Sequence, residues 1–425
     1  MSQSSRTPKQ FSSEHVPDDV VSDILTLLPV KSLIRFRCVS KPWNSIITNP
    51  DFINTHFDRA KSLSISNSNN GYLLYAVIVN NYDQKLCIDV CNSDRTLTHI
   101  SRFQMPISHV RGVGFCNGIF CLYNFLNRML FLWNPSIRKF KMVAPAPTTR
   151  IHFIRSSFTF GFAYHSQNND FKILRMASYT LEPPAAEVYT LSTDSWREVE
   201  LSGSGPNIKS IDSLNGDSWN GSLPCLFVNG ALHCIAETLD FNFILAFDVN
   251  DGKIREINLP PRNYLDRVNE HFERLAVFKG SLALIVFGED IDEGIDICVI
   301  WVMREYGVVE SWTKISVPVC WVDRFFGCTN NDELLIETIG KFLLSFDPVS
   351  LNNYPLGIPN SISEGQVSWM NHTANFMESL VLLDGTNYWQ GSHFCEIHID
   401  KYFVVSYNAI WILNETLMAF FLLLF

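Results

Sequence analysis

A short phrase recurs along the middle of the chain, and it constrains the fold more than any other feature of the sequence. Each copy consists of an apolar strand, a polar turn and a second strand that ends in an aromatic or apolar pair. The copies recur about every 44 to 58 residues, which is the range of a four-stranded propeller blade. Six copies predict six blades, with seven or eight left open. The copies are LFLWNPSIRKFKMV from Leu130, EVYTLSTDSWREVEL from Glu187, ILAFDVNDGKIREINL from Ile244, VIWVMREYGVVESWTKI from Val299, LLSFDPVSLNNYPL from Leu343 and a weaker LCIDVCNSDRTLTHI from Leu86.

The composition is that of a chain that folds around a large apolar interior. Of its 425 residues, 47% are hydrophobic, 13% are aromatic and only 18% are charged, which excludes an intrinsically disordered chain. The formal net charge of -10 argues against a nucleic-acid partner, because phosphate binding requires a local excess of Lys and Arg. No apolar stretch follows the charges at the N-terminus, so we expect no secretory signal and a location in the cytoplasm, the nucleus or both.

The eleven cysteines fit a reducing compartment. Their number is odd, their spacing is scattered and several lie in apolar runs, which predicts buried free thiols. The nearest approach to a metal cluster is HFCEIH, in which His393, Cys395 and His398 lack a fourth ligand. We therefore expect no metal site and no cofactor. Sequence motifs for P-loop, serine hydrolase and zinc-protease chemistry do not occur either.

Residues 16–60 have helical periodicity, whereas residues 1–15 are polar and rich in Ser and are expected to form a disordered tail. In VPDDVVSDILTLLP, apolar residues recur at spacings of three and four until Pro29 ends the helix. VKSLIRFRCVS and KPWNSIITNP predict two further short helices, and DFINTHFDRAK continues at helical spacing. We expect N-caps at Ser32 and Ser40.

These helices carry more apolar surface than they can bury among themselves. Three helices in roughly 45 residues form a domain that is marginal without a partner or an attached domain. The surplus predicts a docking surface.

The same segment resembles a known helical motif. Residues 16–57, VPDDVVSDILTLLPVKSLIRFRCVSKPWNSIITNPDFINTHF, are similar to an F-box in the form found in plants. The resemblance implies that the segment packs against the C-terminal helices of a Skp1-type adaptor, and through it joins the cullin and RING subunits of a ubiquitin ligase. For single side chains, among them Ile24, Phe36 and Trp43, a place in the module's own core is an equal alternative. The implied contacts with the adaptor are Pro17, Leu28, Pro29, Leu33 and Val39.

The copies of the repeat also resemble, in order, the phrases of the F-box-associated domain of plant F-box and kelch-like proteins. Together with the F-box, the resemblance covers about residues 16–350 and implies an adaptor role. The matching phrases are GVGFCNGIFCLY at 112–123, LWNPSIRK at 132–139, FGFAYH with DFKILR at 160–175, VYTLSTDSWR at 188–197, FVNGALHCIA at 227–236, ILAFDVNDGKIREINLP at 244–260 and WVMREYGVVESWTKI at 301–315.

The expected architecture is mixed. A small all-α F-box module at residues 16–60 is followed by an all-β, propeller-like domain at residues 61–400. Residues 401–425 form an apolar tail that is long enough to span a bilayer but is interrupted by a polar triplet with one charge, at 414–416. Three readings of this tail stay open: a membrane anchor, a final strand or a disordered end.

The expected function is that of the non-catalytic substrate-recognition subunit of an SCF-type (Skp1, cullin, F-box) E3 ubiquitin ligase, whose β domain binds a target protein for ubiquitination. One alternative is a protein-binding scaffold that works without ubiquitin. A more remote one is a propeller glycoside hydrolase, which needs two facing carboxylates. The acidic cluster EDIDEGID at 289–296 is more simply a solvated hairpin tip. Trp133, Trp196 and Trp312 occupy the same point of successive copies, which predicts interior packing and not a ligand cage.

Overall fold

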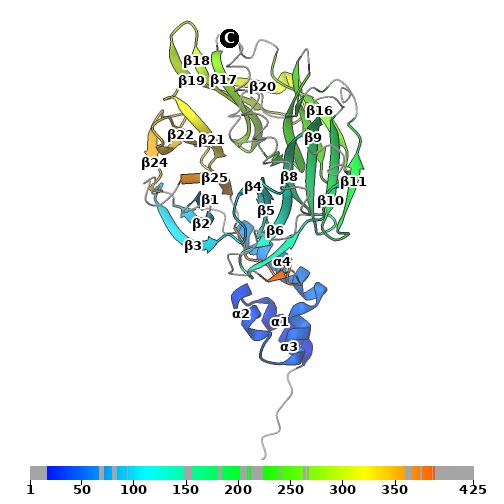
Figure 1. The fold of residues 1–425 in the computed structure, drawn as a ribbon. Helices are drawn as coiled ribbons and strands as arrows, with labels where there is room; N and C mark the ends of the chain where they lie inside the picture. The colour runs from blue at the N-terminus through cyan, green and yellow to red at the C-terminus, as the bar shows by residue number, and fades with distance from the viewer. Residues whose placement is uncertain are drawn as a thin grey trace, which may run out of the picture. The chain divides into compact units, whose positions relative to one another are not determined.

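Among the residues that the computed structural model describes, four α-helices precede a ring of β-sheets (Figure 1). The helices are α1 (Asp18–Thr26), α2 (Val30–Phe36), α3 (Lys41–Thr48) and α4 (Pro50–Ser66). The structure describes residues 17–66, 71–78, 84–92, 94–147, 156–179, 184–201, 208, 210–211, 224–238, 241–261, 265, 268–358, 366–373, 376–384 and 386–387.

Local chemistry determines where the helices begin. The Ser40 hydroxyl accepts a hydrogen bond from the Trp43 backbone N–H at 3.3 Å, which confirms Ser40 as the N-cap of α3. The expectation of a cap at Ser32 is wrong, because α2 already begins at Val30, directly after Pro29. Pro29 itself is the N-cap residue, with φ -59° and ψ 148°, and its side chain has no group that could accept a hydrogen bond, so this helix starts without a side-chain cap.

The described strands form six antiparallel sheets, which we number as blades 1 to 6. Blade 1 contains β25 (Gln366–Thr373), β1 (Gly71–Ile78), β2 (Gln84–Cys91) and β3 (Leu97–Gln104); blade 2 contains β4 (Val110–Cys116), β5 (Ile119–Asn124), β6 (Met129–Asn134), β7 (Lys139–Met142) and β26 (Thr386–Asn387). Blade 3 contains β8 (Ser156–His165), β9 (Asp170–Tyr179), β10 (Ala185–Thr190) and β11 (Ser195–Val199); blade 4 contains β12 (Ser210–Ile211), β13 (Leu226–Val228), β14 (Ala231–Glu237), β15 (Asn242–Asp248) and β16 (Ile254–Asn258). Blade 5 contains β17 (Val268–Phe278), β18 (Ser281–Asp290), β19 (Ile295–Met303) and β20 (Trp312–Pro318); blade 6 contains β21 (Val322–Cys328), β22 (Leu334–Thr338), β23 (Leu343–Phe346) and β24 (Asn353–Pro355).

The inner strands of the six blades contact one another in a closed ring, in the order β4, β8, β13, β17, β21, β25 and back to β4. Strand β25 closes the ring, because it pairs antiparallel with β1, the first strand of the β region, with Tyr72 opposite Thr373. Blade 1 therefore combines strands from both ends of the β region. The prediction of a propeller with six blades is confirmed.

Alternate residues of a middle strand pack against different neighbouring blades. In β15, Phe243, Leu245 and Phe247 share a core cluster with residues of blade 3. Ile244 and Ala246 of the same strand share another cluster with residues of blade 5. Successive side chains of a strand point to opposite faces of its sheet, so both faces of blade 4 are buried. This explains why the strands appear in the sequence as continuous apolar runs and not as alternating ones.

Two of the three singled-out tryptophans connect neighbouring blades. Trp196 on β11 donates its indole N–H to the Ala144 carbonyl at 2.7 Å, and Trp312 on β20 donates to the Asn258 carbonyl at 3.2 Å. Each acceptor lies at or just beyond the end of the outer strand of the preceding blade. Trp133 is buried too, but it lies on β6, the third strand of its blade. The expectation that all three occupy the same point of the repeat is therefore wrong for Trp133, whereas interior packing holds for it and for Trp312.

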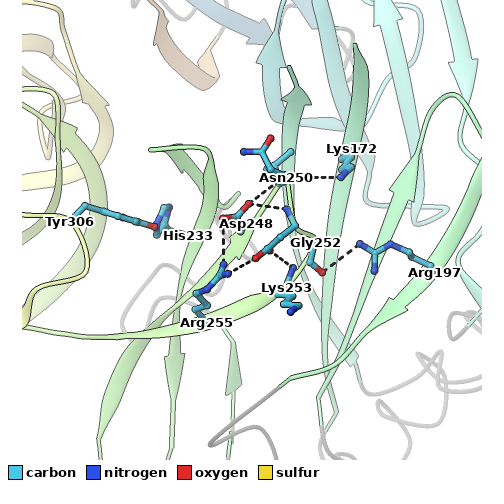
Figure 2. A network of polar contacts seen from close by, with 11 residues as sticks. Lys172, Arg197, His233, Asp248, Asn250, Gly252, Lys253, Arg255 and Tyr306 are labelled. Atoms are coloured by element: carbon cyan, nitrogen blue, oxygen red, sulfur yellow. Dashed lines mark hydrogen bonds and ion pairs between the residues drawn. The ribbon is translucent and has the colours of Figure 1, made fainter. Parts of the chain in front are cut away.

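A hairpin of blade 4 is tied to blade 3 by polar contacts (Figure 2). The Asp248 carboxylate closes the turn between β15 and β16 by accepting hydrogen bonds from two backbone N–H groups of the turn, at 2.8 and 3.1 Å. Lys172 on β9 donates from Nζ to the Val249 carbonyl at 2.5 Å, and Arg197 on β11 donates to the Gly252 carbonyl at 3.4 Å. Blade 3 therefore supplies donors for the orphan carbonyls of this turn.

The opposite side of blade 4 is tied to blade 5 by a buried histidine (Figure 2). His233 on β14 lies 3.3 Å from the Leu226 carbonyl through Nδ1 and 2.7 Å from the Tyr306 hydroxyl through Nε2. A neutral ring satisfies both partners, with Nδ1 donating and Nε2 accepting. Burial lowers the pKa of His233 to about 4, so the ring is neutral in the folded protein at neutral pH.

The buried ion pair of blade 3 provides a test of this packing. Arg175 Nη1 lies 2.6 Å from Glu187 Oε2, and the two side chains are only 3% and 2% exposed. Glu187→Leu leaves a guanidinium charge in the interior, so we expect it to lower the free energy of unfolding by about 3–5 kcal/mol. Adding Arg175→Met removes that charge and should restore most of the loss. Urea denaturation of the single and double variants checks this, and equal instability of both would contradict it.

Acid should destabilise the ring through His233. The folded pKa of about 4 lies below the ordinary value of 6.5, so the unfolded state binds the proton more tightly and stability falls as the pH drops below 6.5. For this residue we expect a loss of about 2 kcal/mol between pH 7 and pH 5. Denaturation of the wild type and of His233→Gln at both pH values measures it. An unchanged pH dependence in the variant would show that His233 is not responsible.

Candidate protein-binding surfaces

One side of α1 presents large apolar side chains to solvent. Val20, Ile24 and Leu27 are 45%, 53% and 57% exposed, and Val39, just after α2, is 62% exposed. The spacing of i, i+4 and i+7 places Val20, Ile24 and the C-cap residue Leu27 on one face of the helix. Contiguous exposed apolar side chains of this size are a feature of protein interaction sites.

The other side of the helical module is packed. Leu25, Val30, Leu33, Ile47 and Phe52 are buried in one cluster that joins all four helices. The exposed stripe on α1 is thus the apolar surface that remains after the module has formed its core.

The five contacts implied by the F-box resemblance lie in three different environments. Pro17, Pro29 and Val39 are exposed, whereas Leu28 is half-buried. Leu33 has no exposed surface. Together with Val30 it forms the buried side of the short helix α2.

For Ile24, Phe36 and Trp43 the alternative was a place in the core of the helical module, and their burial tests it. Ile24 is more than half exposed, so it is not a core residue. Phe36 and Trp43 are half-buried and pack against each other with ring centroids 5.4 Å apart. The exposed role of Val20, Ile24 and Leu27 was missed from the sequence, although their common helical face was the signal for it.

The propeller has two ends with different surfaces. In each blade, consecutive strands run up and down. The turns between the first and second strands and between the third and fourth strands therefore lie at one end of the propeller. The turn between the second and third strands and the connection to the next blade lie at the other end. At the first end, Gly118 in the turn after β4 and Asn134 at the end of β6 contact residues 377–381. We call this the helix-side end and its opposite the far end. Exposed apolar residues gather at the far end: Phe125, Leu126, Phe241, Ile291, Trp321, Ile339 and Phe342.

A pocket of about 150 Å³ lies at the far end, between blades 5 and 6. Its lining includes the aromatic rings of Phe272, Phe287 and Trp321. Its carboxylates include those of Glu289 and Asp296, which stand directly opposite each other on β18 and β19. Like charges in that position disfavour the strand pair. The acidic cluster at 289–296 forms the end of this hairpin, as predicted.

Some acidic side chains in the described part of the chain are engaged in structural contacts. The carboxylates of Asp248 and Asp251 both pair with Arg255, and Asp248 also closes its turn. No group of His, Cys, Asp and Glu side chains there has the composition of a metal site. The ten described cysteines are free, and burial raises the pKa of Cys298 well above its ordinary value.

Some sequence expectations fall outside the described residues. These are the disordered tail at 1–15, the HFCEIH cluster with His393, Cys395 and His398, and the apolar tail at 401–425. Among the four helices that are described, none combines the length and the apolarity that a bilayer span requires.

Comparison with known protein families identifies both parts of the chain. The F-box domain matches residues 14–55, and the F-box associated beta propeller domain matches residues 65–381. Similar proteins from Arabidopsis thaliana include F-box protein At3g07870 (26% identity, 84% of this chain and 92% of that protein), F-box/kelch-repeat protein At3g23880 (24%, 73% and 82%) and F-box protein CPR1 (25%, 71% and 72%).

A solved structure with weaker likeness is the periplasmic gluconolactonase of Pseudomonas aeruginosa. It is 12% identical, with 72% of this chain and 100% of that chain covered, and the TM-score of 0.34 is too low to carry an argument. The family matches cover α1 to α3, the start of α4 and strands of all six blades. The chain belongs to the family of proteins in which an F-box domain is followed by an F-box associated β-propeller domain.

Proposed function

We propose that this protein is the substrate-recognition subunit of an SCF-type E3 ubiquitin ligase. In this role the F-box docks a Skp1-type adaptor, which connects it to the cullin and RING subunits, and the propeller holds a target protein for ubiquitination. The observation that carries the proposal is the apolar stripe of α1, which stays exposed while the rest of the module is packed. Such a subunit acts in the cytoplasm or the nucleus. It positions the target protein within the ligase and does not itself catalyse the reaction.

The proposed adaptor surface differs in detail from the five contacts implied by the sequence. Pro17, Pro29 and Val39 contribute directly, together with the α1 stripe, and Leu28 contributes through its exposed part. Leu33 acts from the interior by holding α2 against the other helices. Burying a large apolar side chain contributes about 1.5–3 kcal/mol, so three or four of them supply a substantial share of a tight interface.

The target protein is proposed to bind at the far end of the propeller. Among the described residues, the connections at this end carry more exposed apolar side chains than those at the helix-side end. The pocket beside Trp321 also lies here. Loops on a rigid scaffold are the usual place for recognition residues. The helix-side end is partly occupied by the chain's own residues 377–381.

Adaptor docking can be tested with a matched pair of isoleucines. Ile24→Asp places a charge in the proposed interface, and we expect the affinity for a Skp1-type adaptor to fall about 30-fold or more. Ile100→Asp is the control, because Ile100 on β3 is similarly exposed, at 45% against 53% for Ile24. Titration of purified full-length chains with the adaptor measures both. A wild-type protein that does not bind the adaptor would favour the scaffold that works without ubiquitin.

Target binding can be tested by affinity purification from plant cells in which the proteasome is blocked. We expect Trp321→Ala plus Phe342→Ala to lose proteins that the wild type retains, because both side chains are large, exposed and at the far end. Adaptor capture should stay unchanged. Val349→Ala plus Leu351→Ala, exposed on the helix-side end, serves as the control. The far-end assignment is wrong if the control loses the same proteins and the first variant keeps them.

A further inference from the structure

The core of the helical module is not made by the helices alone. Leu380 and Leu383 follow strand β25 in the sequence and are 0% and 7% exposed. They belong to the same cluster as Leu25, Val30 and Leu33. Ile137, from the turn between β6 and β7, packs against this cluster as well. Part of the apolar surplus of the helices is thus covered by the same chain, and only the remainder is available to a partner.

Residues 376–384, which we call the linking segment, are fixed on the propeller. Asn134 is fully buried at the end of β6, and its Nδ2 donates to the carbonyls of Ser379 at 2.8 Å and Val381 at 2.9 Å. Gly118 lies so close that a Cβ on it would stand 2.8 Å from the Met377 carbonyl oxygen. A side chain at position 118 would therefore push the segment away.

Side chains of the linking segment point to two different partners. Met377 and Leu382 belong to the core cluster between blades 2 and 3. Leu380 and Leu383 belong to the core of the helical module. The segment therefore has one apolar side on the propeller and one on the helices, and it joins these two cores although it lies several hundred residues after the helices in the sequence.

The position of the segment along the chain ties it to ring closure. It follows β25, the strand that completes blade 1, and it precedes β26, which pairs with β7 of blade 2. Only two residues separate β25 from the segment, so the pairing of β25 with β1 brings the segment close to its place beside the helices. Helix α4 makes a separate junction, in which Phe57 packs on Tyr164 with ring centroids 5.3 Å apart, and this junction does not require β25.

We infer that the linking segment is a positioning element for adaptor docking, with Leu380 and Leu383 holding α1 to α3 in the arrangement that the adaptor binds. A chain whose propeller has not closed lacks these two side chains in the module core and does not engage the adaptor. The ligase would then be coupled only to completely folded receptors. This inference rests on the proposed function for its binding readout. It goes beyond that function because it makes adaptor docking depend on residues 376–384, which lie several hundred residues after the F-box.

The test uses the full-length chain and two sets of leucine substitutions within the same segment. Leu380→Ala plus Leu383→Ala removes the contribution to the helices, and we expect adaptor affinity to fall about tenfold or more. Leu382→Ala is the matched control, because Leu382 faces the propeller; it should leave adaptor affinity within about twofold of the wild type. Hydrogen exchange provides a second readout, since the double variant should exchange faster in α1 to α3 and not in the blades.

Each outcome decides something. Wild-type affinity and wild-type exchange in the double variant would overturn the inference, and in that case Ile24→Asp in the same assay still reports on the docking proposal. If no form binds the adaptor, the proposed function fails, but hydrogen exchange still tests whether Leu380 and Leu383 hold the helices. Slow exchange in α1 to α3 of the double variant would then sink the positioning role by itself.

Discussion

Burial of both faces of every blade is the constraint on which the rest of the structure depends. In β15, neighbouring residues such as Ile244 and Leu245 belong to the cores on opposite sides of one sheet. A blade without neighbours would expose two apolar faces, so the sheets are stable only as a closed ring. Closure in turn requires a strand from the end of the β region, and β25 supplies it by pairing with β1. The hydrogen bonds between blades then fix how neighbouring blades align, and they add little to the free energy of folding.

Ring closure also determines the environment of the helices. A module of this size has too small a core to be stable alone, and here it gains two leucines from the chain that has just closed the ring. Asn134 shows how the polar cost of this junction is met. Its side-chain amide donates to two backbone carbonyls of the linking segment, those of Ser379 and Val381. The junction thus combines apolar packing with hydrogen bonds from a buried side chain.

The sequence was sufficient for the architecture because the repeat and the strand periodicity are local signals. Blade number, the N-cap at Ser40 and the acidic hairpin tip all follow from residues close in sequence. The candidate site was harder. A motif match at Leu33 cannot separate core from interface, since that depends on which neighbours the fold brings to it. The role of Leu380 was invisible, because the cluster that it shares with Val30 and Leu33 joins residues far apart in the sequence.

Sharing a core has a thermodynamic consequence for the whole molecule. Free energies of substitutions add when sites are distant and independent, and they fail to add when sites share packing. Leu25 in α1 and Leu382 in the linking segment are separated by most of the chain, yet Leu380 and Leu383 lie between their two clusters. The positioning role inferred above therefore predicts that the stability of the blades and the order of the helices are coupled. It also predicts that a change at the closure strand β25 alters the exposed stripe of α1 through this packing.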